Sequence, residues 1–322
     1  MKKTSLLLLL PLILGACGKK ATTAADAPAG KKTLTVGFSQ IGAESAWRTA
    51  NTQSIKDEAQ KRGINLQFSD AQQKQENQIK ALRSFVAQGV DVIAFSPVVE
   101  TGWEPVLQEI KQAGIPVVLS DRSVDVSDPS LFVTFIGSDF VEEGRRAGTF
   151  LAQKTSGKAV IAELVGTPGA APAIDRKKGF EEVLAKYPDM KIVKSQSGDF
   201  TRAKGKEVME SFLKAPDAKQ ITAVFAHNDD MALGAIQAME EAGVQPGKDI
   251  VVVSIDGVKG AFEAMSAGKL NCTVECNPLI GGQLFDAVDA VVNKKELPRR
   301  LTVKEGVFEQ SQAAAELPNR KY

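Results

Sequence analysis

The chain has 322 residues, with 40 Lys and Arg against 39 Asp and Glu, a formal net charge of +1, and 43% hydrophobic residues. A near-neutral balance gives no reason to expect nucleic acid or an acidic membrane surface as partner, because such binding needs a concentrated basic patch. The length allows one large or two ordinary α/β domains, each with a substantial core.

Residues 1–17 are predicted to be a lipoprotein signal peptide. Lys2 and Lys3 precede the apolar run 6–14, which is far shorter than the about 20 residues that span a bilayer. The stretch Leu14-Gly-Ala-Cys17 resembles the bacterial lipobox, so Cys17 is expected to carry the lipid. The alternative is an ordinary signal peptide with an incidental cysteine. Residues 18–32 have the composition of a flexible tether, and the remainder is expected outside the cytoplasm.

After the tether, short apolar β-branched runs alternate with longer amphipathic runs. The predicted strands are 34–39, 64–70, 90–97, 115–121, 132–137, 159–166, 191–198, 221–228, 250–256 and 272–276. The predicted helices are 45–62, 75–88, 103–113, 141–154, 175–187, 202–214, 231–242, 261–267 and 279–293. This alternation predicts an α/β fold with parallel sheets covered on both faces, and the length favours two sheets of about five strands, divided near Gly137.

Two cysteines remain after the tether, Cys272 and Cys276. In a strand their Cα atoms would lie roughly 13 Å apart, beyond the limit of about 7 Å for a disulfide. A metal site is not expected, because His227 is the only histidine and no acidic cluster accompanies the pair. We therefore predict two half-buried thiols, with neither metal nor cofactor.

Polar or aromatic residues follow strand after strand, where ligands bind in open parallel sheets. They are Ser39-Gln40, Ser69-Asp70, Ser96-Pro97, Asp121-Arg122, Gly166-Thr167, Asp199-Phe200, Asn228-Asp229 and Asp256-Gly257. About half of these pairs are explained equally well as ordinary helix N-caps. Asp121-Arg122 resists that explanation, because the next helix begins much later, and so does Arg176 after its Gly, Ala and Pro loop.

These groups suit a polyhydroxylated ligand, since carboxylates accept hydrogen bonds, guanidinium groups donate them, and amides do both. Trp47 and Phe200 could cover the apolar C–H face of a sugar ring. Core packing is the alternative, and it stays open for Phe200. Trp47 lies in the opening turn of the first predicted helix, where that helix end points toward the expected ligand site.

Several longer motifs now identify a resemblance to the ribose/galactose class of periplasmic binding proteins, and within it to galactofuranose binders of ABC transporters. The motifs include Phe38-Ser-Gln, Glu44-Ser-Ala-Trp-Arg48, Asp70-Ala-Gln-Gln-Lys-Gln75, Leu119-Ser-Asp-Arg122, Ala173-Ile-Asp-Arg-Lys-Lys-Gly179, Ser195-Gln-Ser-Gly-Asp-Phe-Thr201, Ala226-His-Asn-Asp-Asp230 and Ser254-Ile-Asp-Gly257. The resemblance covers nearly the whole chain after the tether. It implies two doubly wound lobes, joined by a three-segment hinge, that enclose a sugar.

The resemblance also implies lobe boundaries and ligand contacts. The first lobe would comprise 33–136 plus 277–300, the second 137–276 plus 301–322, with the later crossings at 272–276 and 298–301. The implied contacts are Glu44, Ser45, Trp47, Arg48, Asp121, Arg122, Thr167, Arg176, Phe200, Asn228, Asp256 and Glu275. The charged first loop departs from the ribose binders, and Cys276 stands where they carry a glutamine.

We therefore expect a monomeric receptor, periplasmic or on the cell surface and held to the membrane only by its lipid, that closes on a galactofuranose-like or galactose-like monosaccharide. It would deliver that sugar to an ABC permease and have no enzymatic activity. A sensor presenting sugar to a chemoreceptor or membrane kinase is the alternative. A glycoside-processing enzyme would need an acid and a base or nucleophile flanking one bond, and the neighbouring arginines are expected to hold the carboxylates ionised instead.

Overall fold

The computed structural model describes residues 33–322. The predicted signal peptide, the lipobox cysteine Cys17 and the tether lie outside the described residues. No helix within residues 33–322 is long and apolar enough to cross a membrane. The described chain contains two six-stranded sheets, each covered by helices, and we call each sheet with its helices a lobe.

The first lobe is built on an all-parallel sheet in the order β11-β5-β4-β3-β1-β2. Its strands are β1 (Thr35–Gln40), β2 (Asn65–Asp70), β3 (Val92–Phe95), β4 (Val117–Ser120), β5 (Thr134–Gly137) and β11 (Arg300–Thr302). Its helices are α1 (Ala46–Arg62), α2 (Gln75–Gln88), α3 (Glu104–Gln112) and α9 (Gly281–Val292).

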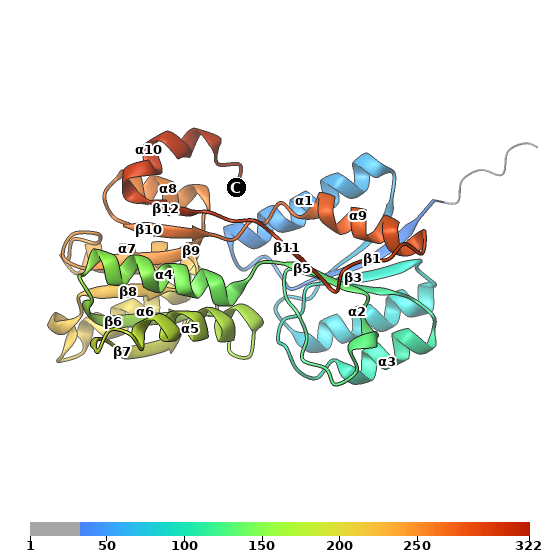
Figure 1. The fold of residues 1–322 in the computed structure, drawn as a ribbon, viewed down its shortest axis with the longest axis horizontal. Helices are drawn as coiled ribbons and strands as arrows, with labels where there is room; N and C mark the ends of the chain where they lie inside the picture. The colour runs from blue at the N-terminus through green and yellow to red at the C-terminus, as the bar shows by residue number, and fades with distance from the viewer. Residues whose placement is uncertain (1–32) are drawn as a thin grey trace, which may run out of the picture. The chain divides into compact units, whose positions relative to one another are not determined.

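Alternation along the strands divides the first core into two layers. Val92 and Ala94 pack with residues of α1 and α9, whereas Ile93 and Phe95 pack with residues of α2 and α3. Figure 1 shows these two helix pairs on opposite faces of the sheet. The four inner strands β1, β3, β4 and β5 are buried on both faces, which explains why they appear in the sequence as mostly apolar runs.

The second lobe has the sheet order β12-β10-β9-β8-β6-β7, in which only the β10–β12 pair is antiparallel. Its strands are β6 (Lys158–Val165), β7 (Asp189–Ser197), β8 (Ala223–Ala226), β9 (Val251–Asp256), β10 (Cys272–Glu275) and β12 (Val307–Glu309). Its helices are α4 (Phe140–Lys154), α5 (Ala171–Leu184), α6 (Arg202–Lys214), α7 (Asp229–Glu241), α8 (Lys259–Ser266) and the short α10 (Ala313–Glu316). Single 3₁₀ turns occur at Pro129–Leu131, Ala218–Gln220, Gln310–Gln312 and Leu317–Asn319.

Helices α4 and α5 approach each other at two glycines. A Cβ on Gly144 would lie 2.1 Å from the carbonyl oxygen of Arg176, and a Cβ on Gly179 would lie 1.9 Å from that of Val141. No side chain fits at either position, so the absence of a Cβ permits the close helix contact. This contact brings Arg176 on α5 within reach of Glu143 on α4.

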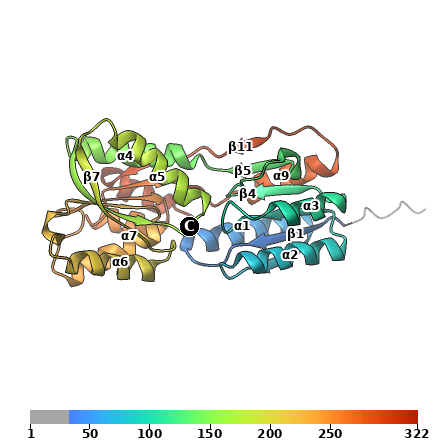
Figure 2. The ribbon, with the colours of Figure 1, turned by 90° about the horizontal axis from the view of Figure 1, so that it is seen from below.

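Three segments connect the lobes, and Figures 1 and 2 show the connections after β5 and β11 running side by side. The first follows β5 at 138–139, the second joins β10 to α9 at 276–280, and the third joins β11 to β12 at 303–306. The third connection lies later than the 298–301 expected from the sequence, because Arg300 to Thr302 pair with Phe135 to Gly137 in the first sheet. β11 is a half-exposed edge strand of three residues, too short to give a recognisable pattern.

The predicted fold class is confirmed: the chain forms two doubly wound, mostly parallel sheets. Each predicted strand and helix overlaps an observed one, and β11, β12 and α10 are additional. The largest shift is in α5, which begins at Ala171 rather than at 175, with Pro172 in its first turn, where the missing N–H costs nothing. Arg176 therefore lies on a formed helix.

Candidate functional site

A cavity of about 290 Å³ lies between the lobes and is lined by residues of both. This volume is the space between the protein atoms at the site and includes space open to solvent. The lining residues are Glu44, Ser45, Trp47, Arg48, Asp121, Arg122, Phe140, Pro172, Arg176, Phe200, Asn228, Asp256 and Cys276.

Ten of the residues expected from the sequence line this cavity. The first lobe supplies six from the start of α1 and the end of β4, and the second lobe supplies Arg176, Phe200, Asn228 and Asp256. Polar residues at successive strand ends therefore do meet in space, as the parallel-sheet pattern predicts.

Thr167 and Glu275 are not among the lining residues. The Glu275 carboxylate accepts hydrogen bonds from the backbone N–H of Gly306 at 3.0 Å, from Arg320 at 3.0 Å and from the Tyr322 hydroxyl at 3.3 Å. It thus ties the third connection and the C-terminal residues to β10. The Thr167 carbonyl accepts from Ala170 N–H at 3.1 Å in the turn before α5.

In the first lobe, Arg48 is the centre of a buried charge network. Its Nε lies 3.0 Å from Glu44 Oε1 and its Nη2 lies 2.7 Å from Asp121 Oδ2, while Ser96 Oγ donates to the same Asp121 oxygen at 3.1 Å. Burial alone would lower the pKa of Arg48, but Asp121 and Glu44 outweigh it, and the pKa is raised. Arg48 therefore stays charged and fixes both carboxylates.

Two buried polar atoms at the cavity have no hydrogen-bond partner among the described residues: Arg122 Nε and Glu44 Oε2. Arg122 Nη1 donates to the Val98 carbonyl at 3.0 Å, and its Nε is 3.8 Å from Asp121 Oδ2, too far for a hydrogen bond. Burial and the neighbouring Arg48 lower the pKa of Arg122 to about 10. Because unpaired buried polar atoms are costly, a polar ligand here would gain a donor and an acceptor.

In the second lobe, Arg176 on α5 is held by Glu143 on the neighbouring helix α4 and by the backbone just after β8. Its Nε lies 2.7 Å from Glu143 Oε2, and its Nη1 donates to the His227 carbonyl at 2.6 Å. Asp256 Oδ1 is 3.5 Å from Nη2, and burial raises the pKa of Asp256 well above its usual value despite Arg176. The expectation that neighbouring arginines would hold every carboxylate ionised is therefore wrong for Asp256, because desolvation outweighs the attraction.

The aromatic and amide residues of the cavity are fixed by the backbone. Trp47 Nε1 donates to the Cys276 carbonyl at 2.6 Å, and Phe200 lies under Arg122 with the guanidinium carbon 5.2 Å from the ring centroid. Asn228 caps α7 by accepting from Met231 N–H at 3.0 Å and donates to the Phe200 carbonyl at 3.1 Å. Asn228 is thus both a helix cap and a lining residue.

Three residues that line the cavity have strained backbone conformations. Asp121, Phe200 and Asp256 have φ values of 64°, 61° and 132°, a region that non-glycine residues rarely adopt. Each such conformation costs on the order of 1–3 kcal/mol and persists only where surrounding structure enforces it. All three lie at or just after a strand end, where the turn directs the side chain to the lining.

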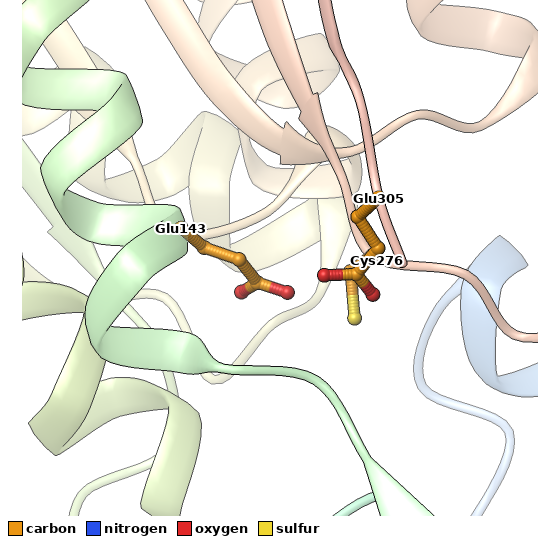
Figure 3. Close-up of side chains that lie close together, drawn as sticks. All are labelled: Glu143, Cys276 and Glu305. Carbon is orange, nitrogen blue, oxygen red and sulfur yellow. The ribbon is translucent and has the colours of Figure 1, made fainter. Parts of the chain in front are cut away.

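Phe140, Pro172 and Cys276 also line the cavity, although they were not among the contacts expected from the sequence. A cluster beside the cavity was not expected either. Figure 3 shows Glu143, Cys276 and Glu305 facing one another, with potential ligand atoms within 4.8 Å. The statement that no acidic cluster accompanies the cysteines is therefore wrong. The acids come from α4 and from the third connection, neither of which is near Cys276 in sequence.

This cluster joins all three connections between the lobes. Ser138 Oγ, from the first, donates to Glu305 Oε1 and contacts Cys276 Sγ at 3.4 Å, and Asn277 N–H donates to Glu305 Oε1 at 3.0 Å. Burial raises the pKa of Glu305 to about 8 and raises the pKa values of Glu143 and Cys276 as well. Protons, together with Arg176, thus limit the negative charge of the cluster.

Two α/β lobes, three connections and an enclosed polar cavity define a two-lobed solute-binding protein. A family model described as periplasmic binding protein domain matches residues 36–296, and the chain belongs to that family. The family is one of solute-binding proteins and not of enzymes.

Individual relatives sharpen the assignment. The galactofuranose-binding protein YtfQ of Escherichia coli (strain K12) is 55% identical over 291 residues, which cover 89% of this chain and 92% of YtfQ. The binding protein of the arabinose ABC transporter of Shewanella sp. ANA-3, solved with α- and β-L-arabinofuranose, is 58% identical with a TM-score of 0.87 and covers 89% of this chain and 95% of its own. A Mycobacterium smegmatis protein in complex with β-D-fucofuranose is 55% identical with a TM-score of 0.88, covering 90% and 96%. The resemblance found in the sequence is confirmed.

Proposed function

We propose that this protein binds one monosaccharide in its furanose form, of the galactofuranose or L-arabinofuranose type, and delivers it to an ABC permease. The observation that carries the proposal is the cavity between the lobes, into which both lobes bring charged and aromatic side chains. The named ligands of three relatives at 55–58% identity, a galactofuranose, an arabinofuranose and a fucofuranose, support the furanose form.

The ten expected residues that line the cavity are the proposed sugar contacts. Glu44 and Asp256 would accept hydrogen bonds from sugar hydroxyls, and Arg122 would donate one from its unpartnered Nε. Trp47 and Phe200 would cover the apolar C–H face of the ring. Two hydroxyls placed there would satisfy Arg122 Nε and Glu44 Oε2, the lining atoms that have no partner among the described residues.

We propose that the structure corresponds to the closed state, which opens by bending at the three connections. The lobes contact each other at the rim, where Glu100 N–H donates to the Gly169 carbonyl at 2.9 Å and Ala46 N–H donates to Asp230 Oδ2 at 2.7 Å. Opening would expose both walls to water, and only the closed form makes every contact to the sugar at once. The proposed moving bodies are the two lobes, with the third boundary at 303–306.

We propose that the mature protein is a monomer held at a membrane through a lipid on Cys17, with residues 18–32 as its tether. The support is the sequence alone: an apolar run, a lipobox-like Leu14-Gly-Ala-Cys17 and a spacer rich in Ala, Thr, Lys, Gly and Pro without aromatic residues. Membership of the periplasmic binding protein family agrees with export. Metabolic labelling with a fatty acid analogue should tag the wild-type protein and not Cys17→Ser.

The sugar proposal is tested by titration calorimetry and thermal shift with methyl β-D-galactofuranoside, L-arabinose, D-galactose, D-ribose and D-glucose. A dissociation constant near 1 μM corresponds to about −8 kcal/mol, and a ligand at 100 times its dissociation constant stabilises the folded state by about 2.7 kcal/mol. We expect the galactofuranoside or L-arabinose to bind more tightly than ribose and glucose. Tighter binding of ribose, or no binding by any of the five, would refute the proposal.

A further inference from the structure

The N-terminus of α1 forms part of the cavity wall, and its first N–H groups need acceptors from outside the helix. Ser45 is the N-cap, and its Oγ accepts from Arg48 N–H at 3.1 Å. The first turn of α1 contains no acidic residue, although a negative charge there would be favoured by the helix dipole. The first turn of α1 therefore contains no negatively charged side chain that could interact with the helix dipole.

The second lobe supplies that partner. Asp230, in the first turn of α7, accepts a hydrogen bond from Ala46 N–H through Oδ2 at 2.7 Å. Its other oxygen accepts from Arg202 Nε at 3.2 Å and Nη2 at 3.1 Å, and Asp230 is only 6% exposed. A buried carboxylate of one lobe thus caps the leading helix of the other lobe.

The position of this bond links it to the sugar cavity without making it a sugar contact. Ala46 lies between the lining residues Ser45 and Trp47, and Asp230 follows the lining residue Asn228 by two positions, but neither Ala46 nor Asp230 lines the cavity. The bond therefore joins the two walls at the point where each turns toward the ligand.

We propose that Asp230 is a positioning residue that sets sugar affinity from outside the sugar site. It caps α1 only when the lobes are closed, so its hydrogen bond and its attraction to the helix dipole stabilise the closed state alone. By linkage, any free energy that favours closure raises affinity by the same factor and appears as slower release. This inference rests on the proposed closure around a sugar.

A purely local role for Asp230 makes a different prediction. Asp229 and Asp230 are both in the first turn of α7, so either could serve the dipole of their own helix. The Arg202 pair is also local to the second lobe, and the Arg202 side chain is 55% exposed, where solvent screens the pair. A local role would change the thermal stability of the sugar-free protein without changing the rate of sugar release.

The experiment compares wild-type protein with Asp230→Asn and Asp230→Ala, using L-arabinose and methyl β-D-galactofuranoside in stopped-flow fluorescence and calorimetry. Asp230→Asn keeps an acceptor but removes the charge. We expect its dissociation constant to rise between about 3-fold and 30-fold, the effect of a charge at a partly buried helix N-terminus. Almost all of the change should be in the dissociation rate, and Asp230→Ala should show a larger effect.

Two matched controls separate the cross-lobe bond from its surroundings. Arg202→Gln removes the local partner of Asp230 and leaves the bond to Ala46, and Glu241→Gln removes an exposed carboxylate from the same helix. Both should release sugar at the wild-type rate within about 2-fold. Wild-type release by Asp230→Asn, or a change confined to sugar-free thermal stability, would overturn the inference. If the wild-type protein binds neither sugar, the proposed function itself fails, which is a distinguishable result.

Discussion

The cavity residues of the two lobes are alike in how they fix one arginine and differ in which polar groups they leave without a full set of partners. Each wall contains a guanidinium that is fully engaged by the protein: Arg48 with Glu44 and Asp121, and Arg176 with Glu143 and the His227 carbonyl. The two lobes differ in which polar groups at the cavity retain unused hydrogen-bonding capacity. In the first lobe, the donor Arg122 Nε and the acceptor Glu44 Oε2 have no partner among residues 33–322, whereas in the second lobe Asp256 has a raised pKa and only a 3.5 Å contact to Arg176.

The comparison separates proposed contacts whose side chains the protein already holds from proposed contacts whose hydrogen-bonding capacity is incomplete without a ligand. Arg48 and Arg176 are expected to matter for stability, because they neutralise buried carboxylates. Arg122 and Asp256 are expected to matter for affinity, because their hydrogen-bonding capacity is incomplete without a ligand. Mutants at these four positions test the division directly.

The largest effect is expected from removing Arg48 or Arg176. Arg48→Ala would leave Glu44 and Asp121 buried without their cation, and breaking a buried pair in this way costs about 3–5 kcal/mol. We expect the free energy of unfolding in urea to fall by that amount without sugar present, and the same for Arg176→Ala. Near wild-type stability of both variants would show that the buried carboxylates do not depend on these arginines for stabilisation.

Next in size is the loss of Arg122 or Asp256. Arg122→Ala and Asp256→Ala should each weaken sugar binding by about 2–5 kcal/mol in calorimetry, the usual penalty for truncating one partner of a buried charged contact. Asp256→Asn should lose less, because the raised pKa of Asp256 already reduces the cost of a neutral group. A dissociation constant within a few-fold of wild type for Asp256→Ala would place the ligand elsewhere.

A smaller effect is expected at Glu275, which the resemblance assigned to the ligand and the structure places with Arg320 and Tyr322. Glu275→Gln should lower the free energy of unfolding by about 1 kcal/mol, as for a partly exposed ion pair. Its sugar affinity should stay within about 3-fold of wild type. A loss of affinity as large as that of Asp256→Ala would return Glu275 to the sugar site.

The smallest effect is a pH dependence at the rim. Burial, together with the neighbouring carboxylates of Asp175 in the second lobe and Asp125, raises the pKa of Glu100. If the closed state raises this pKa, protonation favours closure: the contribution to sugar affinity is fully present below the ordinary pKa of 4.5 and is lost as the pH rises through the raised pKa. Calorimetry of wild type and Glu100→Gln across this range should show the dependence only in wild type; parallel curves would refute it.

The alternation of strand and helix patterns in the sequence was sufficient to predict the site residues that lie at the carboxyl edge of a single sheet. Asp121 and Arg122 follow the buried strand β4, Asp256 ends the buried strand β9, and parallel strands necessarily bring their carboxyl ends to one edge of a sheet. Helix capping and a position at the cavity are not exclusive explanations of a strand-end residue, because Asn228 both caps α7 and lines the cavity. Local pattern therefore located most of the site, and the resemblance to a family ranked the candidates.

What could not be predicted depends on contacts between distant segments. Glu143 lies in a run with Glu142, Arg145 and Arg146 that is typical of a solvated helix face, yet it is 1% exposed against Arg176. Glu305 belongs to a connection that follows the three-residue strand β11, which carries no sequence signal. The raised pKa of Asp256 depends on the depth of burial, which strand-end position alone does not give.

The contact of α4 with α5 at Gly144 and Gly179 has a consequence for how selectivity can change. The backbones of α4 and α5 are in direct contact there, so side-chain size does not set the distance between the two helices. The backbone position of Arg176 on α5 is therefore fixed relative to α4. If Phe200 and Asn228 contact the sugar as proposed, we expect substitutions at these two positions to change sugar preference without displacing that positive charge. Sugar selectivity could therefore change through residues such as Phe200 and Asn228, while the α4–α5 contact and the position of Arg176 stay constant.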